Sequence, residues 1–177
     1  MKLNSIKEYY ADGAPWVAYT TNKDGNRHGT YKHWHNNGQL MEQCEYVNGK
    51  PHGTYARWYE NGQLWARCEY VNGRIHGTYA RWYENGQLLE QSEYLNDKRH
   101  GISKIWHWYE NGVPLCTQQW NNGELLVEVK YTYKNKPLKV VVINILKPNI
   151  ESTTFIANTI TQLNKNGHKF KIKHLPN

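Results

Sequence analysis

A text of 24 residues recurs along this chain and constrains its fold more than any other feature. The dipeptide His-Gly stands at positions 28, 52, 76 and 100, so each copy begins 24 residues after the last. The copy at residues 52–74 reads HGTYARWYENGQLWARCEYVNGR, and the stretches on either side of it are nearly the same. A fixed period of this length is typical of repeat proteins, in which each unit packs only on its neighbours. We therefore expect a stacked array.

The first two copies each contain two Asn-Gly dipeptides, which are strong turn signals, and the third contains one. Asn61-Gly62 and Asn72-Gly73 separate runs rich in Tyr, Trp, Leu and Thr, and Asn37-Gly38 and Asn85-Gly86 repeat the first of them. Asn-Gly suits a two-residue type I′ turn, since both central residues need a positive φ. Two reversals per copy predict consecutive β-hairpins. Because a single hairpin is marginally stable in water, the hairpins should pair into one antiparallel sheet of about ten to twelve strands.

The repeated text resembles the MORN repeat family, in the variant with a Tyr-x-x-Trp-Tyr-x-Asn-Gly core and a Tyr-x-Asn-Gly-x-x-His-Gly close. Here the core stands at residues 55–62 and the close at residues 70–77, and the likeness covers about residues 9–123. The resemblance implies an elongated sheet of stacked hairpins that serves as a binding scaffold. It also implies a likeness to bacterial antitoxin-like proteins and to proteins of large DNA viruses. It brings no shared catalytic residue.

The chain changes in kind after about residue 133. Residues 139–145 are a β-branched run, residues 151–164 have apolar side chains at helical spacing, and residues 168–174 alternate Lys with apolar residues. This order predicts a strand, a helix and a strand, with a crossover long enough for a parallel strand pair. The fold class is therefore mainly β with a small α+β cap. We assign residues 1–133 to the repeat array and residues 134–177 to the Lys-rich cap.

Positive charge concentrates in that cap. From Lys130 onward there are nine lysines and one acid, Glu151, a net charge of +8, whereas the whole chain carries +7. A basic segment can bind anionic lipid or nucleic acid, or its lysines can simply keep a small cap in solution. The scarcity of Arg and of stacking aromatics argues against nucleic acid. The candidate basic contacts are Lys165, Lys169, Lys171 and Lys173.

Aromatic residues, 14% of the chain, supply the second candidate surface. Counting outward from a two-residue turn at Asn61-Gly62 places Trp58 opposite Trp65, with Tyr55, Tyr59 and Tyr70 on the other face. Aromatics on both faces of one sheet cannot all be buried within it, which favours a protein partner. Core packing is the alternative role. The candidate binding-face residues are Trp34, Trp58, Trp65, Trp82, Trp106 and Trp108.

The recurring histidines have a structural interpretation. Equivalent positions lie about 10 Å apart across two strand spacings, too far to share a zinc ion. Counting outward from Asn72-Gly73 pairs Tyr70 with Ile75 and Glu69 with His76. The same count predicts that Glu45 pairs with His52 and Glu93 with His100. Each pair should contribute modestly to stability.

Nothing in the sequence indicates an enzyme. It has no glycine-rich phosphate loop, nucleophile elbow or carboxylate pair, so we expect no cofactor and no small-molecule substrate. The three cysteines and the lack of a signal peptide or membrane-length apolar run suggest an intracellular protein, in the cytoplasm or in a virus particle. The first functional hypothesis is a scaffold for protein–protein contacts, such as a structural part of a viral particle. The alternatives are a peripheral module that binds anionic lipid and an antitoxin-like binding partner.

Overall fold

The computed structural model describes residues 3–106, 114–133, 138–145, 147–166 and 170–174. These residues are mainly β-strand, as predicted, and the hydrogen-bonded strand order follows the sequence apart from β7, which pairs with β6. Twelve of the 14 described strands lie in residues 1–133, within the ten to twelve predicted for the array, and the other two are the predicted strands of the cap. The residues fall into two compact units. The first unit contains residues 1–89 and 94–97, and the second contains residues 90–93 and 98–177.

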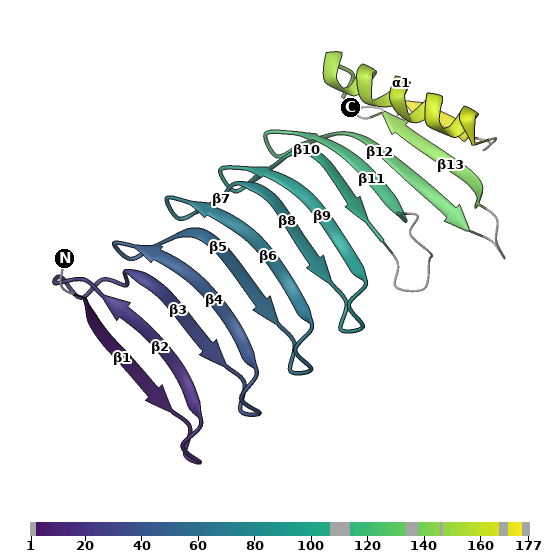
Figure 1. The fold of residues 1–177 in the computed structure, drawn as a ribbon. Coiled ribbons are helices and arrows are strands. Elements are labelled where there is room, and N and C mark those ends of the chain that lie inside the picture. Colours follow the sequence, from purple (N-terminus) through teal and green to yellow (C-terminus); the bar gives the residue numbers. More distant parts are fainter. Residues whose placement is uncertain (1–2, 107–113, 134–137, 146, 167–169, 175–177) are drawn as a thin grey trace. The chain divides into compact units, whose positions relative to one another are not determined.

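The first unit is a succession of antiparallel hairpins, which Figure 1 shows side by side. Its turns follow each other at Asn37-Gly38, Asn61-Gly62 and Asn85-Gly86, as predicted. The two ends of strand β9 belong to this unit and its middle to the second. The strands are β1 (Asn4–Tyr9), β2 (Pro15–Thr21), β3 (Gly29–Trp34), β4 (Leu40–Val47), β5 (Lys50–Trp58), β6 (Leu64–Val71), β7 (Arg74–Ile75), β8 (Gly77–Trp82) and β9 (Leu88–Leu95).

The two Asn-Gly turns of a repeat have different structures. At the hairpin tip between β5 and β6, the Gly62 N–H donates to the Tyr59 carbonyl at 3.0 Å and the Tyr59 N–H to the Gln63 carbonyl at 2.8 Å. Gly62 takes a φ of +80°, while Asn61 does not adopt a positive φ. This is a type I turn followed by a left-handed glycine, which forms a bulge. The predicted two-residue type I′ turn is therefore wrong at this position.

The longer tip shifts the strand register. Arg57 pairs with Ala66, but the next residue, Trp58, pairs with Leu64. The sequence count placed Trp58 opposite Trp65, and this placement is wrong. The physical reason is that Asn61 accepts the Gln63 N–H at 2.9 Å through its side chain, which holds Asn61 in a right-handed turn conformation.

The short return between β6 and β7 follows the prediction. Asn72 and Gly73 both take a positive φ, of 52° and 84°, as a type I′ turn requires. Tyr70 pairs with Ile75 and Val71 with Arg74, so the register counted from this turn is confirmed.

Glu69 and His76 stand opposite each other across the short return, as predicted, and the His76 N–H donates to the Glu69 carbonyl at 3.0 Å. The carboxylates of Glu45 and Glu69, however, bond to threonines and not to the histidines. The Glu45 carboxylate accepts a hydrogen bond from the Thr30 hydroxyl at 2.7 Å, and Glu69 accepts one from Thr54 at 2.8 Å. Both threonines stand opposite these acids on the preceding strand. A neutral hydroxyl thus satisfies each carboxylate on the side away from the histidine. The third pair, Glu93 and His100, stays a prediction.

The histidines support the next return instead. The Asn72 N–H approaches His52 Nδ1 at 3.5 Å, and the Asn48 N–H approaches His28 Nδ1 at 3.4 Å. These contacts are long for hydrogen bonds and are individually weak. A shorter bond lies beside the first, where the Gly73 N–H donates to the Pro51 carbonyl at 2.8 Å. Each return is thereby attached to the His-Gly segment at the start of its own repeat.

The second unit contains the predicted strand, helix and strand. The helix was expected at residues 151–164 and begins and ends one residue beyond these limits. Asn149 is its N-cap, and Asn149 and Ser152 form a reciprocal capping box. The strand pair on either side of the helix is parallel, as predicted. The elements are β10 (Lys98–Ile105), β11 (Cys116–Asn121), β12 (Glu124–Tyr133), β13 (Leu138–Ile145), α1 (Ile150–Lys165) and β14 (Phe170–His174).

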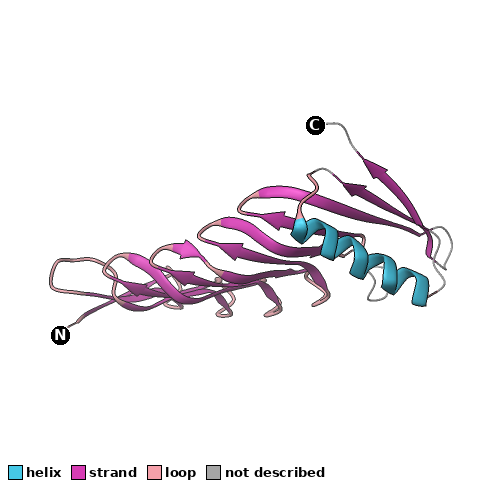
Figure 2. Cartoon of the chain, turned by 90° about the horizontal axis from the view of Figure 1, so that it is seen from above, coloured by secondary structure: helices cyan, strands magenta, loops and turns pink. Residues whose placement is uncertain are grey.

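The core of the second unit lies between α1 and the strands. Figure 2 shows α1 (cyan) along one side of the strands of this unit. Leu163 of the helix is buried in one cluster with five strand residues, and Phe155, Ile156 and Ile160 pack against it. None of the described helices is long and apolar enough to cross a membrane. The strand residues of the cluster are Leu126, Val127, Val129, Ile143 and Ile145.

Candidate binding surface

One face of the first unit carries a row of paired tyrosines. Tyr31 and Tyr46 meet edge to face with ring centroids 6.1 Å apart, and the equivalent Tyr55 and Tyr70 are 6.0 Å apart. Such pairs stabilise a sheet beyond the area they bury. Tyr55 and Tyr70 therefore share a face, as the sequence predicted, whereas Tyr59 belongs to the hairpin tip.

Cysteines are buried beneath this row. Cys44 and Cys68 are 1% and 2% exposed, and each pairs across the sheet with Tyr55. Burial raises the pKa of the Cys44 thiol to about 12 and that of Cys68 to about 11. Both thiols are protonated at neutral pH, so they act as small packing residues and not as nucleophiles.

A hollow of about 340 Å³ opens beside the hairpin tips of the first unit. The Arg57 guanidinium lies 4.6 Å from the centre of the Trp65 ring, which is a cation–π contact. Tyr59 lines the same hollow, with the carboxylates of Glu60 and Glu84. The register shift after Arg57 leaves Trp65 without a directly paired residue on β5, and this bulge places it with Arg57.

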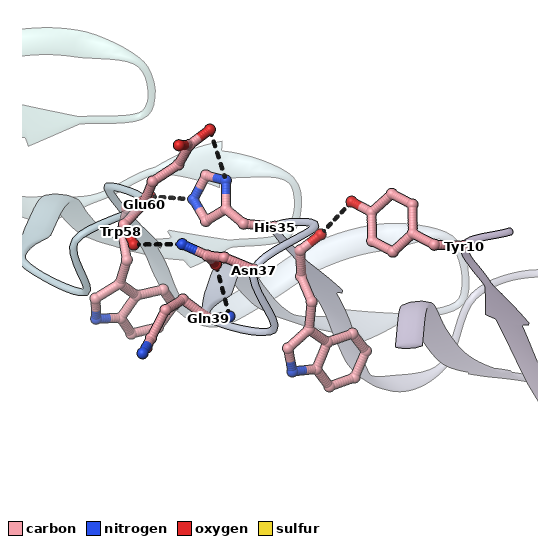
Figure 3. A network of polar contacts seen from close by, with 7 residues as sticks. Tyr10, His35, Asn37, Gln39, Trp58 and Glu60 are labelled. Carbon is pink, nitrogen blue, oxygen red and sulfur yellow. Dashed lines mark hydrogen bonds and ion pairs between the residues drawn. The ribbon is translucent and has the colours of Figure 1, made fainter. Parts of the chain in front are cut away.

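Hydrogen bonds between successive tips hold this edge of the unit together (Figure 3). His35 Nε2 bonds to the Trp58 carbonyl at 3.0 Å, as Figure 3 shows. The Tyr59 hydroxyl donates to the Trp82 carbonyl at 2.9 Å. The Tyr10 hydroxyl makes the equivalent bond to the Trp34 carbonyl at 2.6 Å. In Figure 3 the Trp58 indole extends away from His35 and Glu60, so Trp58 supplies its carbonyl to this edge.

This network was not predicted. Its sequence signal is the residue after each repeated Trp, which carries a hydrogen-bonding ring in His35, Tyr59 and Tyr83. Asn37 and Asn61 add a parallel set, because their side-chain amides donate to the carbonyls of Glu60 and Glu84 at 2.8 and 2.9 Å.

The structure distributes the predicted tryptophans over separate positions. All of the predicted tryptophans that it describes are half-buried, and Trp65 lies with Arg57 and not opposite Trp58. Trp108 lies outside the described residues. The described members of the predicted set are Trp34, Trp58, Trp65, Trp82 and Trp106.

The predicted basic residues lie in the second unit. Lys165 is exposed in the last turn of α1, and Lys171 and Lys173 are exposed on β14. Lys169 lies outside the described residues. In the part of the chain that the structure describes, none of the other three lysines forms an ion pair with an acidic side chain.

The comparisons with known proteins agree with the repeat geometry. Residues 27–48, 51–72 and 75–96 each match the family described as the MORN repeat variant. A search of curated proteins found no match. Repeats of this family commonly mediate contacts with proteins or membranes, and the family is non-catalytic. Within the described residues, no group of three His, Cys, Asp or Glu side chains is arranged to hold a metal ion.

Proposed function

We propose that this chain, which carries three consecutive MORN repeats of the variant type, is a non-enzymatic scaffold that binds another protein. The contact surface is the hollow at Trp65. One observation carries this proposal: the hollow gathers Trp65, Arg57 and Tyr59, the three residue types most enriched among residues that dominate binding energy.

The surroundings of the hollow suit this role. Trp65 and Tyr59 are half-buried, so they offer apolar area without needing a large rearrangement. Hydrogen bonds from Tyr59 to Trp82 and from Asn61 to Glu84 hold the tips in place. A pre-organised surface loses less conformational entropy on binding, which favours affinity.

The test is affinity capture from the native source with wild-type protein and three tryptophan variants. Trp65→Ala should lose the captured partner, whereas Trp16→Ala should retain it. Trp16 is the matched control because it is 41% exposed and does not line the hollow. Trp58 also lines the hollow, so Trp58→Ala tests a second tryptophan there. Capture that is lost with Trp58→Ala and kept with Trp65→Ala would refute the central place given to Trp65. The partner's identity distinguishes the narrower hypotheses of a viral structural component and an antitoxin-like protein.

Anionic lipid is the second candidate ligand, favoured by the exposed lysines of the second unit. Lys171 and Lys173 stand two residues apart on β14, so their side chains project to the same side of that strand. This function predicts binding to phosphatidylserine vesicles that weakens with added salt and is lost in the Lys171→Glu, Lys173→Glu double variant. Phosphatidylcholine vesicles are the control. Equal binding to both vesicle types, or no binding to either, would exclude the lipid function.

A further inference from the structure

A second hollow, in the second unit, lies between α1 and the strands. It has a volume of about 590 Å³, within the range of roughly 300–1,000 Å³ usual for ligand sites. A smaller hollow of about 300 Å³ shares Ile102 and Lys104 with it. Because the two share these residues, they adjoin, and we call them together the helix groove.

The floor of the helix groove is apolar. Tyr131, Phe155 and Leu163 line it beside the core of the unit, and Ile102 joins them from β10. Ile102 is 44% exposed, so its apolar surface is accessible from the groove. An apolar floor of this kind favours a ligand that brings apolar side chains of its own.

One wall of the groove is a row of side-chain amides. Asn158, Gln162 and Asn166 follow each other every four residues along α1 and at its C-cap. All three are exposed, and in the described structure their side-chain amides have no hydrogen-bond partner. Four residues of helix span about 6 Å. Alternate residues of an extended chain repeat every 6.6 to 6.8 Å or so, a close match to that spacing.

The charge of the groove indicates which charge a ligand should carry. Among the described lining residues, Lys104 is the one charged side chain of the larger hollow, and it is exposed. Glu93 lines only the smaller hollow. A negative group in the larger hollow would therefore meet a cation there and no acid.

We propose that the helix groove binds an extended peptide segment that carries an acidic side chain. The peptide lies along α1 with its main-chain groups at the amides of Asn158, Gln162 and Asn166. Its acidic side chain pairs with Lys104, and its apolar side chains cover Ile102 and Phe155. This site is separate from the hollow at Trp65 and does not depend on it.

The probe is a display library of random seven-residue peptides, selected on the full chain. Selected peptides are synthesised with a fluorophore, and their affinity is measured by anisotropy. We expect Asp or Glu at a fixed position, and at least about tenfold weaker binding when that residue becomes Asn or Gln, as for loss of one charge-assisted hydrogen bond. Gln162→Ala should also weaken binding severalfold.

A charge exchange makes the test specific. Lys104→Glu should weaken the acidic peptide at least tenfold, and a peptide with Lys in place of the acid should regain affinity for this variant. Lys7→Glu on β1 is the control, because it makes the same charge change on an exposed strand of the first unit. Affinity that is indifferent to Lys104→Glu would overturn the proposal.

Two other outcomes would also overturn it. If no peptide is selected but fluorescent fatty acid binds and Lys104→Glu releases it, the groove holds an amphiphile. If no peptide is selected but the chain self-associates in sedimentation and Lys104→Glu abolishes this, the groove holds a second copy. Circular dichroism of each variant checks that the fold is unchanged.

Discussion

The same substitution should destabilise one of the two Asn-Gly turns of a repeat and leave the other nearly unchanged. Asn61 takes no positive φ, and its side chain makes two hydrogen bonds of 2.9 Å, one from the Gln63 N–H and one to the Glu84 carbonyl. Asn72 has a φ of 52°, which costs an L-residue conformational energy that glycine does not incur. We therefore compare Asn61→Gly with Asn72→Gly.

The magnitudes follow from these contacts. Asn61→Gly removes two exposed hydrogen bonds, each worth about 0.5–1.5 kcal/mol. It also frees the unfolded backbone at a cost of about 0.5–1 kcal/mol. The free energy of unfolding should therefore fall by about 1.5–4 kcal/mol. At Asn72 the same entropic cost is offset by relief of the left-handed φ, so the change should stay within about 0.5 kcal/mol of zero.

Urea unfolding at 25 °C measures both values, followed by circular dichroism and by tryptophan fluorescence. Coincidence of the two signals is required before a free energy is extracted. Gly62→Ala and Gly73→Ala are matched controls, since both glycines are left-handed, at φ of 80° and 84°, and an added Cβ meets nothing closer than 3.4 Å. Each should cost about 1–2 kcal/mol. Equal losses for Asn61→Gly and Asn72→Gly would refute the assignment of two turn types.

Three further predictions concern single residues. Hydrogen bonds from Lys130 and Gln118 outweigh the opposing effect of burial and hold the pKa of Glu128 below its ordinary value of 4.5. The ionised Glu128 carboxylate therefore stabilises the fold above pH 4.5 or so, and this stabilisation is lost as pH falls through its folded-state pKa. Glu128→Gln should make Tm less dependent on pH on the acid side of a plot of Tm against pH. An acid side with an unchanged slope would contradict this. Cys44 and Cys68, with pKa values raised to about 12 and 11, should resist iodoacetamide at pH ~8 until urea is added, and mass spectrometry of the native protein showing alkylation would disprove it. Ile143→Ala removes a side chain that is 0% exposed and should lower the unfolding free energy by about 2–5 kcal/mol in the same urea assay, where a loss below 1 kcal/mol or so would show a looser core.

The periodic parts of the fold were predictable because they rest on strong local rules. The apolar spacing of residues 151–164 predicted α1 to within one residue at either end. The short return at Asn72-Gly73 fixed its own register, since a type I′ turn leaves one way to pair the flanking residues.

The tip at Asn61-Gly62 was not predictable from the same rule. Asparagine tolerates both right-handed and left-handed backbone, so the dipeptide alone does not select the turn. The Asn61 side chain accepts the Gln63 N–H within the tip and also donates to the Glu84 carbonyl in the following repeat. The second bond joins residues 23 positions apart, and no local pattern reports it. The contact of Arg57 with Trp65 was missed too, because it depends on the bulge that this unpredicted turn creates.

The third return shows how strongly each turn depends on the start of its own repeat. Here Asn96-Asp97 replaces Asn-Gly, and Asp97 takes a φ of 70°. The Asp97 N–H still donates to the Ile75 carbonyl, at 2.9 Å, and its carboxylate accepts the Ile75 N–H at 2.7 Å. The added bond accounts for an L-residue in a left-handed position, since it attaches the turn twice to Ile75, the residue before the His-Gly of this repeat. In the first two repeats, the equivalent Nδ1 atoms of His28 and His52 face the N–H of the turn asparagine. His76 Nδ1 is instead buried without a hydrogen-bond partner. The repeated His therefore supports its turn weakly. The attachment that persists when the turn sequence changes is the backbone bond from the second turn residue to the carbonyl of the residue before the His, as at Gly73–Pro51 and Asp97–Ile75.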